Sequence, residues 1–263
     1  EQIEQILKEN QDIALVYITH NETGTGILNP IREIGALAHA YGAIFVVDTT
    51  STYAMRPINI KNDNIDFCMA SAQKGLMAMT GISFVVGKRT IIEQSKTYPK
   101  RSYYCNLYMQ YHYFEAHGEM HFTPPVQTVY AMRQAIKEYF AEGEQKKWER
   151  HTRVFEALHK GIERLGFQNI IKRDWQAGLV VTVKYPDDPN WSFSAIHDYC
   201  YKRGFTIYPG KINNTETFRL CALGAIDQSD IETFFEVFEA GLREMEVSLP
   251  VHYGLEEQTD ERE

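Results

Sequence analysis

The feature that most constrains the fold is a series of short apolar runs in the first part of the chain. They cover residues 13–18, 43–47, 65–70 and 82–86 and are rich in β-branched and aromatic residues. A continuous apolar run of this length is typical of a strand buried on both faces. A helix is predicted between the first two runs, because Pro30 opens a segment with apolar residues at helical spacing. This alternation predicts an α/β fold with a mostly parallel sheet and flanking helices.

The remainder of the chain predicts a second, smaller group of elements. The fourth apolar run follows the third so closely that a hairpin return is expected there rather than a helical crossover. From Pro125 the pattern becomes helical, over residues 126–140 and 144–165. Further strands are expected over residues 178–185, 205–208 and 217–221, followed by a terminal helix capped by Ser229.

These patterns predict three parts of the chain. The first is the C-terminal portion of a large ligand-binding domain, the second is a small α/β domain, and the third is an acidic tail. Their predicted boundaries are residues 1–144, 145–250 and 251–263.

Composition excludes several classes of partner. The chain has 27 Lys and Arg against 35 Asp and Glu, a net charge of −8, which argues against a broad nucleic-acid surface. No apolar run approaches the length of a membrane span, about 18 residues. The four cysteines are widely spaced, which is typical of reduced thiols in a cytoplasmic protein.

No metal centre is predicted. The cysteines form no CxxC pair. His117 and His121 are four residues apart, but they lack the HExxH order and Gly118 between them weakens a helix.

Polar residues follow the second and third strands at the point where each is expected to end. Asp48 ends one strand, Ser71 ends the next, and Lys74 comes directly after it. Ligands of open α/β sheets gather at the carboxyl ends of strands. A lysine amine that forms a Schiff base and a carboxylate that keeps a pyridine nitrogen protonated suit pyridoxal phosphate chemistry. Spacing alone also fits a helix-capping Asp48 and a solvated surface Lys74.

Short sequence motifs favour the interpretation of Asp48 and Lys74 as residues of a pyridoxal phosphate site. The segments THNETGTG, VVDTTS and SAQKG resemble, in this order and with these gaps, the class V aminotransferases of fold type I, which depend on pyridoxal 5'-phosphate. The segments FTPP and GFTIYPGK…TFR resemble the 2-aminoethylphosphonate–pyruvate aminotransferase group of that class. The likeness extends from about residue 10 to 245, and these words occupy residues 19–26, 46–51, 71–75, 122–125, 204–211 and 217–219.

The resemblance implies a role for five residues around the cofactor. Lys74 would be the lysine that binds the cofactor aldehyde and the base that moves the proton during transamination. Asp48 would pair with the pyridinium nitrogen. Thr23 would lie near the phenolic oxygen, and Ser71 and Gln73 would reach the cofactor phosphate or its neighbourhood.

Two further residues gain a role from the resemblance. Thr123 matches a residue that reaches the cofactor phosphate of the other subunit, which implies a homodimer with shared active sites. Arg219 matches the arginine that clamps the acidic end of the substrate, and a guanidinium suits a carboxylate and a phosphonate alike. Each has an alternative: Thr123 begins a helix, and Arg219 is an ion-pair partner in a strand.

The activity that the resemblance implies is transfer of the amino group of 2-aminoethylphosphonate to pyruvate, which gives phosphonoacetaldehyde and alanine. Gln73 stands where the phosphonate group often has Asn, so an alanine–glyoxylate or serine–pyruvate type aminotransferase is the alternative. Family members carry a further segment before the position of Glu1, with the helix N-terminus that holds the phosphate. We therefore expect a longer parent protein. A domain fused in front, and a non-catalytic remnant within such a fusion, both stay open.

Overall fold

The computed structural model of the chain describes residues 1–212 and 215–254. The greater part of the predicted acidic tail, from residue 255 on, lies outside the described residues.

Two compact units make up the chain. The segment 21–28 belongs with the C-terminal half, although it lies near the start of the sequence. The domain boundaries suggested by the sequence stay a prediction, because compact units need not coincide with the domains of a longer protein. Unit 1 consists of residues 1–20 and 29–145, and the described part of unit 2 consists of residues 21–28, 146–212 and 215–254.

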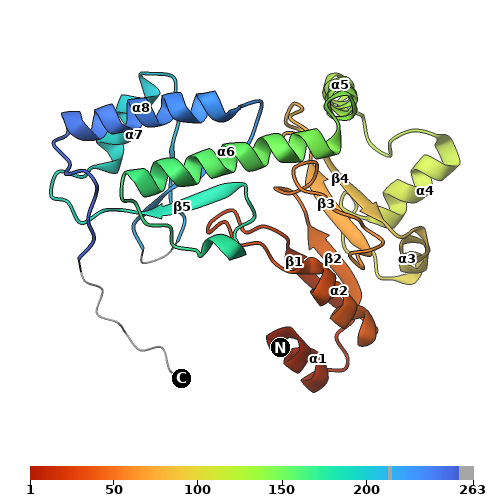
Figure 1. The fold of residues 1–263 in the computed structure, drawn as a ribbon. Coiled ribbons are helices and arrows are strands. Elements are labelled where there is room, and N and C mark those ends of the chain that lie inside the picture. Colours follow the sequence, from red (N-terminus) through yellow and green to blue (C-terminus); the bar gives the residue numbers. More distant parts are fainter. Residues whose placement is uncertain (213–214, 255–263) are drawn as a thin grey trace. The chain divides into compact units, whose positions relative to one another are not determined.

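Unit 1 contains a four-stranded sheet with helices (Figure 1). The strands lie in the order β1-β2-β3-β4 and are β1 (Leu15–Thr19), β2 (Ile44–Asp48), β3 (Phe67–Ser71) and β4 (Ser83–Gly87). The helices are α1 (Gln2–Glu9), α2 (Ile31–Ala40), α3 (Arg89–Gln94), α4 (Leu107–His117) and α5 (Val126–Glu142), with a 3-10 turn over Ser95–Thr97.

Strand direction in this sheet follows the sequence pattern. β1, β2 and β3 are parallel, and β4 returns antiparallel to β3, which confirms the predicted hairpin. Asp48 of β2 lies beside Met69 of β3 in the register. The strand ends that carry Asp48 and Ser71 are therefore neighbours at one edge of the sheet.

The two faces of the sheet are covered differently. On one face, Phe45 and Val47 are fully buried against α2 in an apolar cluster. Side chains alternate along a strand, so Tyr17, Val46 and Asp48 belong to the opposite face. Tyr17 on that face is 53% exposed. The face that carries Asp48 is thus the more open one among the described residues.

Unit 2 is built on an antiparallel sheet in the order β5-β7-β6, with three helices packed on its apolar face. Phe218 and Val181 point into this core and are almost fully buried. The elements are α6 (Glu144–Arg164), a 3-10 turn (Arg173–Trp175), β5 (Val180–Lys184), α7 (Phe193–Tyr201), β6 (Tyr208–Pro209), β7 (Thr217–Cys221) and α8 (Gln228–Glu244).

Two local expectations for this unit are wrong. β6 has only two residues, Tyr208–Pro209, and residues 205–207 of the expected strand lie outside it. The Phe205 backbone N–H instead bonds the Cys200 carbonyl at the end of α7, at 3.0 Å. The N-cap of α8 is Asp227 rather than Ser229. The Asp227 carboxylate accepts hydrogen bonds from the backbone N–H groups of Ser229 and Asp230, and the Asp230 carboxylate accepts one from the Asp227 backbone N–H. The Asp227 carboxylate therefore caps the helix, and Ser229 lies inside it.

Candidate active site

The carboxyl edge of the unit 1 sheet brings a carboxylate close to the start of the lysine loop. Asp48 is the last residue of β2, and both of its oxygens are engaged. Oδ1 accepts a hydrogen bond from the Thr50 backbone N–H at 2.8 Å, and Oδ2 accepts one from the Tyr17 hydroxyl at 3.3 Å. These bonds orient the carboxylate, and each oxygen retains a second lone pair for a cationic N–H.

Lys74 lies in a closed loop directly after β3. The Ala78 backbone N–H bonds the Ala72 carbonyl at 3.0 Å, and the Met77 N–H bonds the Lys74 carbonyl at 2.9 Å. The Lys74 side chain is exposed. Within residues 1–212 and 215–254 its amine has no acidic partner, so it is available for chemistry.

Ser71 adds an unsatisfied hydroxyl at the same edge. Its Oγ is buried and has no hydrogen-bond partner among the described residues. Burying a hydroxyl without a partner is unfavourable, so a polar ligand atom at this position would stabilise the site. A carboxylate, an amine and an unpartnered hydroxyl at adjoining strand ends fit a pyridine ring that carries an aldehyde and further polar groups. Gln73, half-buried, precedes the lysine in the same loop.

Unit 2 brings Arg219 and Thr23 together. Arg219 lies on β7, where its Nε donates to the Pro209 carbonyl and its Nη1 to the Thr23 carbonyl, each at 3.1 Å. A guanidinium has five N–H donors. The Arg219 Nη2 has no hydrogen-bond partner among the described residues, so this nitrogen is available to bind an anion.

The segment that carries Thr23 is held by its own turn and by β5. The Gly26 N–H bonds the Glu22 carbonyl at 2.7 Å, and the Thr182 hydroxyl donates to the Gly24 carbonyl at 3.0 Å. Gly26 has φ +91°, and a Cβ there would lie 2.5 Å from the Val180 carbonyl oxygen. Only glycine fits this turn. The sequence carries no signal for the contact between the Thr23 carbonyl and Arg219.

Thr123 stands apart from these groups. It is exposed in the segment that precedes α5, with Pro125 as the N-cap of that helix. Its side chain makes no hydrogen bond with the described part of the chain, so its role stays a prediction.

His20 is a buried neighbour that the sequence did not single out. It follows β1, is only 6% exposed, and its Nδ1 lies 2.9 Å from the Thr52 hydroxyl oxygen. Burial, helped by the positive charge of Arg56, lowers the pKa of His20 to about 4. The imidazole is therefore neutral at pH 7 and acts as a hydrogen-bonding brace beneath the loop after Asp48.

This buried histidine makes stability depend on pH. Its pKa is lowered on folding, so its contribution is fully present above pH 6.5 and is lost as pH falls toward 4. The shift from 6.5 to about 4 corresponds to about 3 kcal/mol. In the wild type, the urea concentration at the midpoint of unfolding should decrease between pH 7.5 and 4.5. We expect this decrease to be smaller in His20→Asn. A matched control, His197→Asn, changes a more exposed histidine on α7 and should leave that fall intact; equal slopes in wild type and His20→Asn would contradict the account.

Tyr17 is a second neighbour that the sequence did not identify. Partial burial, followed by the Asp48 charge, raises the pKa of Tyr17, so the phenol stays a donor. Tyr17→Phe removes that donor from Asp48 and keeps the ring. We expect cofactor affinity to fall about two- to fivefold, the size of one modest hydrogen bond. Fluorescence titration with pyridoxal phosphate measures this affinity, with Tyr201→Phe at the exposed end of α7 as the control. Unchanged affinity in Tyr17→Phe would reject the role of Tyr17.

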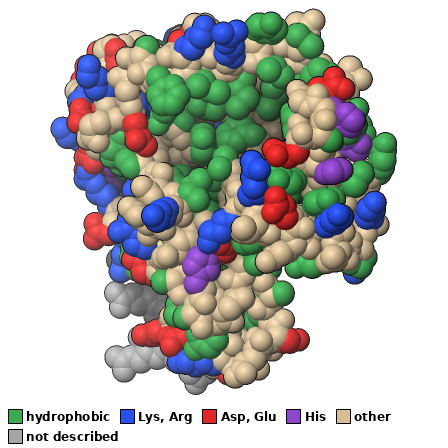
Figure 2. Space-filling model, turned by 90° about the vertical axis from the view of Figure 1, so that its right-hand side faces the viewer, with side chains coloured by type: hydrophobic (Ala, Val, Ile, Leu, Met, Phe, Trp, Pro, Cys, Tyr) green, Lys and Arg blue, Asp and Glu red, His purple; other side chains and the backbone are tan. Residues whose placement is uncertain are grey.

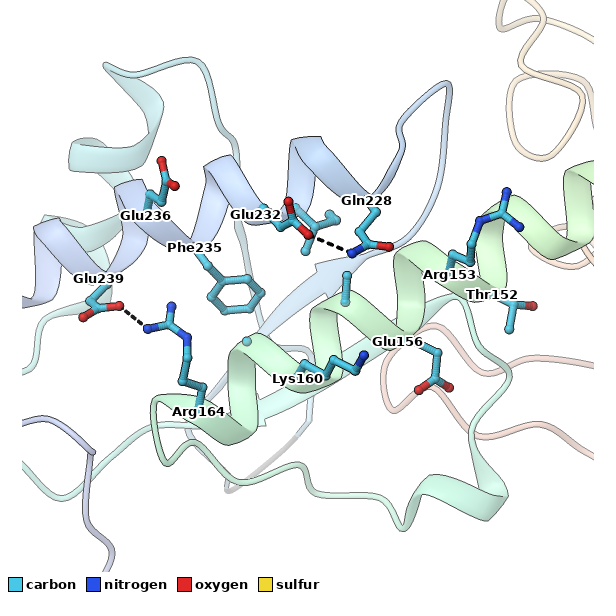
Figure 3. A pocket seen from close by; sticks show the side chains of 13 residues that line it. Thr152, Arg153, Glu156, Lys160, Arg164, Gln228, Glu232, Phe235, Glu236 and Glu239 are labelled. Atoms are coloured by element: carbon cyan, nitrogen blue, oxygen red, sulfur yellow. Dashed lines mark hydrogen bonds and ion pairs between the residues drawn. The ribbon is translucent and has the colours of Figure 1, made fainter.

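Other features of the described residues do not resemble an active site. No group of three or more His, Cys, Asp or Glu residues there is arranged to hold a metal ion. None of the helices in the same part of the chain combines the length and apolar character needed to cross a membrane. A groove of about 570 Å³ runs between α6 and α8, and Figure 3 shows its charged rim. It contains none of the predicted site residues.

Solved structures define the class of fold. A pyridoxamine–pyruvate aminotransferase from Mesorhizobium loti superposes with a TM-score of 0.85 at 20% identity, over 94% of this chain and 64% of that protein. An alanine–glyoxylate aminotransferase from Nostoc sp. gives a TM-score of 0.83 at 22% identity, over 92% of this chain and 65% of that one. The fold is that of fold-type I aminotransferases, which confirms the predicted fold class.

Sequence comparison identifies the family. The aminotransferase class-V family model matches residues 1–208, and this chain belongs to that family. Membership implies pyridoxal 5'-phosphate as the cofactor, in agreement with the prediction. The chain is 34% identical to 2-aminoethylphosphonate–pyruvate transaminase 1 of Cupriavidus pinatubonensis, over 94% of this chain and 65% of that protein. It is 32% identical to a bifunctional phosphonoacetaldehyde hydrolase/aminoethylphosphonate transaminase of Clostridioides difficile, over 90% of this chain and 37% of that protein.

The chain thus spans just under two thirds of the length of the single-function relatives that it matches.

Proposed function

We propose that the full-length protein is a transaminase that uses pyridoxal phosphate to move the amino group of 2-aminoethylphosphonate to pyruvate, which yields phosphonoacetaldehyde and alanine. The observation that carries this proposal is the group at the edge of the unit 1 sheet, where Asp48, Ser71 and Lys74 follow two adjacent parallel strands. The names of the relatives at 32–34% identity support the choice of substrates.

Each residue of this group has a defined task. When bound, pyridoxal phosphate supplies a protonated ring that accepts the electron pair released next to the reacting nitrogen. Asp48 accepts a hydrogen bond from the ring nitrogen and keeps it protonated. The Lys74 Nζ would bind the cofactor aldehyde and would act as the base that moves the proton during transamination. The Ser71 hydroxyl and the Gln73 amide bind the polar substituents.

Arg219 provides selectivity for anionic substrates in this proposal. Its Nη1 is anchored on the Thr23 carbonyl, which leaves Nη2 for the ligand. A phosphonate and a carboxylate both present oxygens at a spacing that a guanidinium recognises. One arginine then serves both half-reactions, the first with the aminophosphonate and the second with pyruvate.

We extend the proposal to a homodimer in the cytoplasm. α4 has no buried residue within the chain, and Tyr103 and Tyr104 before it are 75% and 65% exposed. Figure 2 views the molecule from the side of α3, α4 and α5 and displays hydrophobic side chains gathered there. A second subunit on this side would receive Thr123, which stands exposed in the same part of unit 1. The four cysteines form no disulfide bond with one another, in keeping with a reducing compartment.

Alanine production by the full-length protein tests the substrate. Pyruvate and pyridoxal phosphate are supplied with 2-aminoethylphosphonate, with serine, or with no donor. Turnover with the phosphonate is expected. Turnover with serine alone would instead establish a serine–pyruvate type enzyme, and failure to bind the cofactor covalently would favour a non-catalytic remnant.

A further inference from the structure

The loop that carries Lys74 is in direct backbone contact with the loop that follows Asp48. A Cβ placed on Gly75 would lie 1.9 Å from the Tyr53 carbonyl oxygen and 2.7 Å from the Met55 Cγ. Real Cβ atoms essentially never approach another atom closer than 3.0 Å. The two loops can meet in this way only because residue 75 has no side chain.

The loop after Asp48 is not free to move away from this contact. In the loop after Asp48, the Tyr53 N–H bonds the Thr49 carbonyl at 2.7 Å, and the Thr49 N–H bonds the Met69 carbonyl of β3 at 2.9 Å. Thr52 and Met55 on either side of Tyr53 are almost fully buried. The Tyr53 carbonyl is therefore fixed to the sheet, and a larger residue at position 75 must displace the lysine loop instead.

The lysine loop has strain of its own. Met77 has φ +58° and Ala54, in the facing loop, has φ +57°. Non-glycine residues in this region are unfavourable by about 1 kcal/mol or more and persist where the surroundings impose them. Strained residues on both sides of the Gly75 contact indicate that the two loops hold each other in place.

We propose that Gly75 is a positioning residue, which clasps the Lys74 loop onto the Tyr53 carbonyl and so sets the distance between the Lys74 amine and the Asp48 carboxylate. The inference rests on the proposed function. A pyridine ring held at its nitrogen by Asp48 presents its aldehyde at one distance only, and the amine must meet it there. An alanine at position 75 needs a shift of roughly 1 Å to clear the carbonyl. Misplacement of that size costs about 100-fold in rate.

The test replaces Gly75 with alanine in the full-length protein. Borohydride reduction of samples taken at successive times, followed by peptide mass spectrometry, measures how fast pyridoxal phosphate becomes trapped on Lys74 at a saturating concentration. We expect a fall of at least tenfold in trapping rate, and a changed pH titration of the near-visible absorption of the bound cofactor. Gly35→Ala is the matched control: a Cβ there also clashes, at 2.8 Å from the Asp63 carbonyl oxygen, but in α2. It should lower thermal stability while trapping and titration stay as in wild type.

Hydrogen exchange on the wild-type protein without cofactor supplies a measurement that needs no variant. Segments 49–56 and 72–78 should open with the same free energy, because each is held by the other. Two results would contradict the proposed role of Gly75. One is independent opening of the two segments, and the other is a Gly75→Ala protein that traps cofactor as the wild type does. Absence of trapping in the wild type would instead refute the proposed function and leave the exchange result to decide the clasp.

Discussion

Replacing Lys74 with alanine is expected to abolish transamination, with a loss of at least about 10⁴-fold in kcat. The residue has two tasks in the proposed function, since its amine holds the cofactor and also moves the proton. General acid–base catalysis alone contributes about 10²–10⁴-fold. Its exposed amine has no acidic partner in the part of the chain that the structure describes, so its loss leaves no buried carboxylate uncompensated. Folding should therefore be preserved.

The measurement is alanine formation, together with the near-visible absorption of cofactor bound to the protein. Lys160→Ala on α6 is a suitable control, because that lysine lies in unit 2 and outside the proposed site. Turnover within tenfold of wild type in Lys74→Ala would contradict the role. Loss of both turnover and cofactor absorption in Lys74→Ala, with unchanged thermal stability, would support an enzyme over a structural remnant.

The sequence was sufficient for the parts of the fold that repeat a simple pattern. The run before Asp48 is continuous and apolar, and the run before Ser71 is apolar apart from Asp66, which favours a buried strand at each position. The short gap before β4 left no room for a crossover, so the hairpin followed. Adjacent strand ends then placed Asp48 and the Lys74 loop at one edge of the sheet.

The sequence was insufficient where backbone atoms or competing groups decide the outcome. Gly75 meets a carbonyl oxygen more than twenty residues away, and Arg219 meets the carbonyl of Thr23. A carbonyl is common to every residue, so residue type does not reveal which carbonyl is the partner in either contact. At the start of α8, Asp227 and Ser229 are both good caps, and only the geometry selects the carboxylate.

The assignment of segment 21–28 to unit 2 also depends on backbone contacts that residue type does not reveal. Its residues read as the continuation of β1, and a strand end is where a site on the first sheet is expected. The hydrogen bonds of Gly26 and Leu28 instead tie it to Ala177 and Trp175. Turn geometry and contacts distant in sequence therefore outweigh chain order for this segment.

Replacing Arg219 with lysine is expected to raise the KM for both 2-aminoethylphosphonate and pyruvate by about ten- to a hundredfold, with a smaller effect on kcat. Lysine keeps the positive charge but loses the planar fork, so it cannot donate to the Pro209 and Thr23 carbonyls while binding an anion. Hydrogen bonds to charged groups contribute about 1.5–3 kcal/mol, which corresponds to this range.

Initial rates with each substrate varied in turn measure the two KM values, and Arg203→Lys in the exposed turn after α7 is the control. The shared effect is the informative outcome. A single arginine that serves both half-reactions must weaken both substrates together, because each presents its anionic group to the same donors. A rise in one KM alone would assign the other anion to a different cation. No rise in either would reduce Arg219 to a brace between β7 and the Thr23 segment, and the selectivity of the enzyme would then have to reside in residues outside this strand.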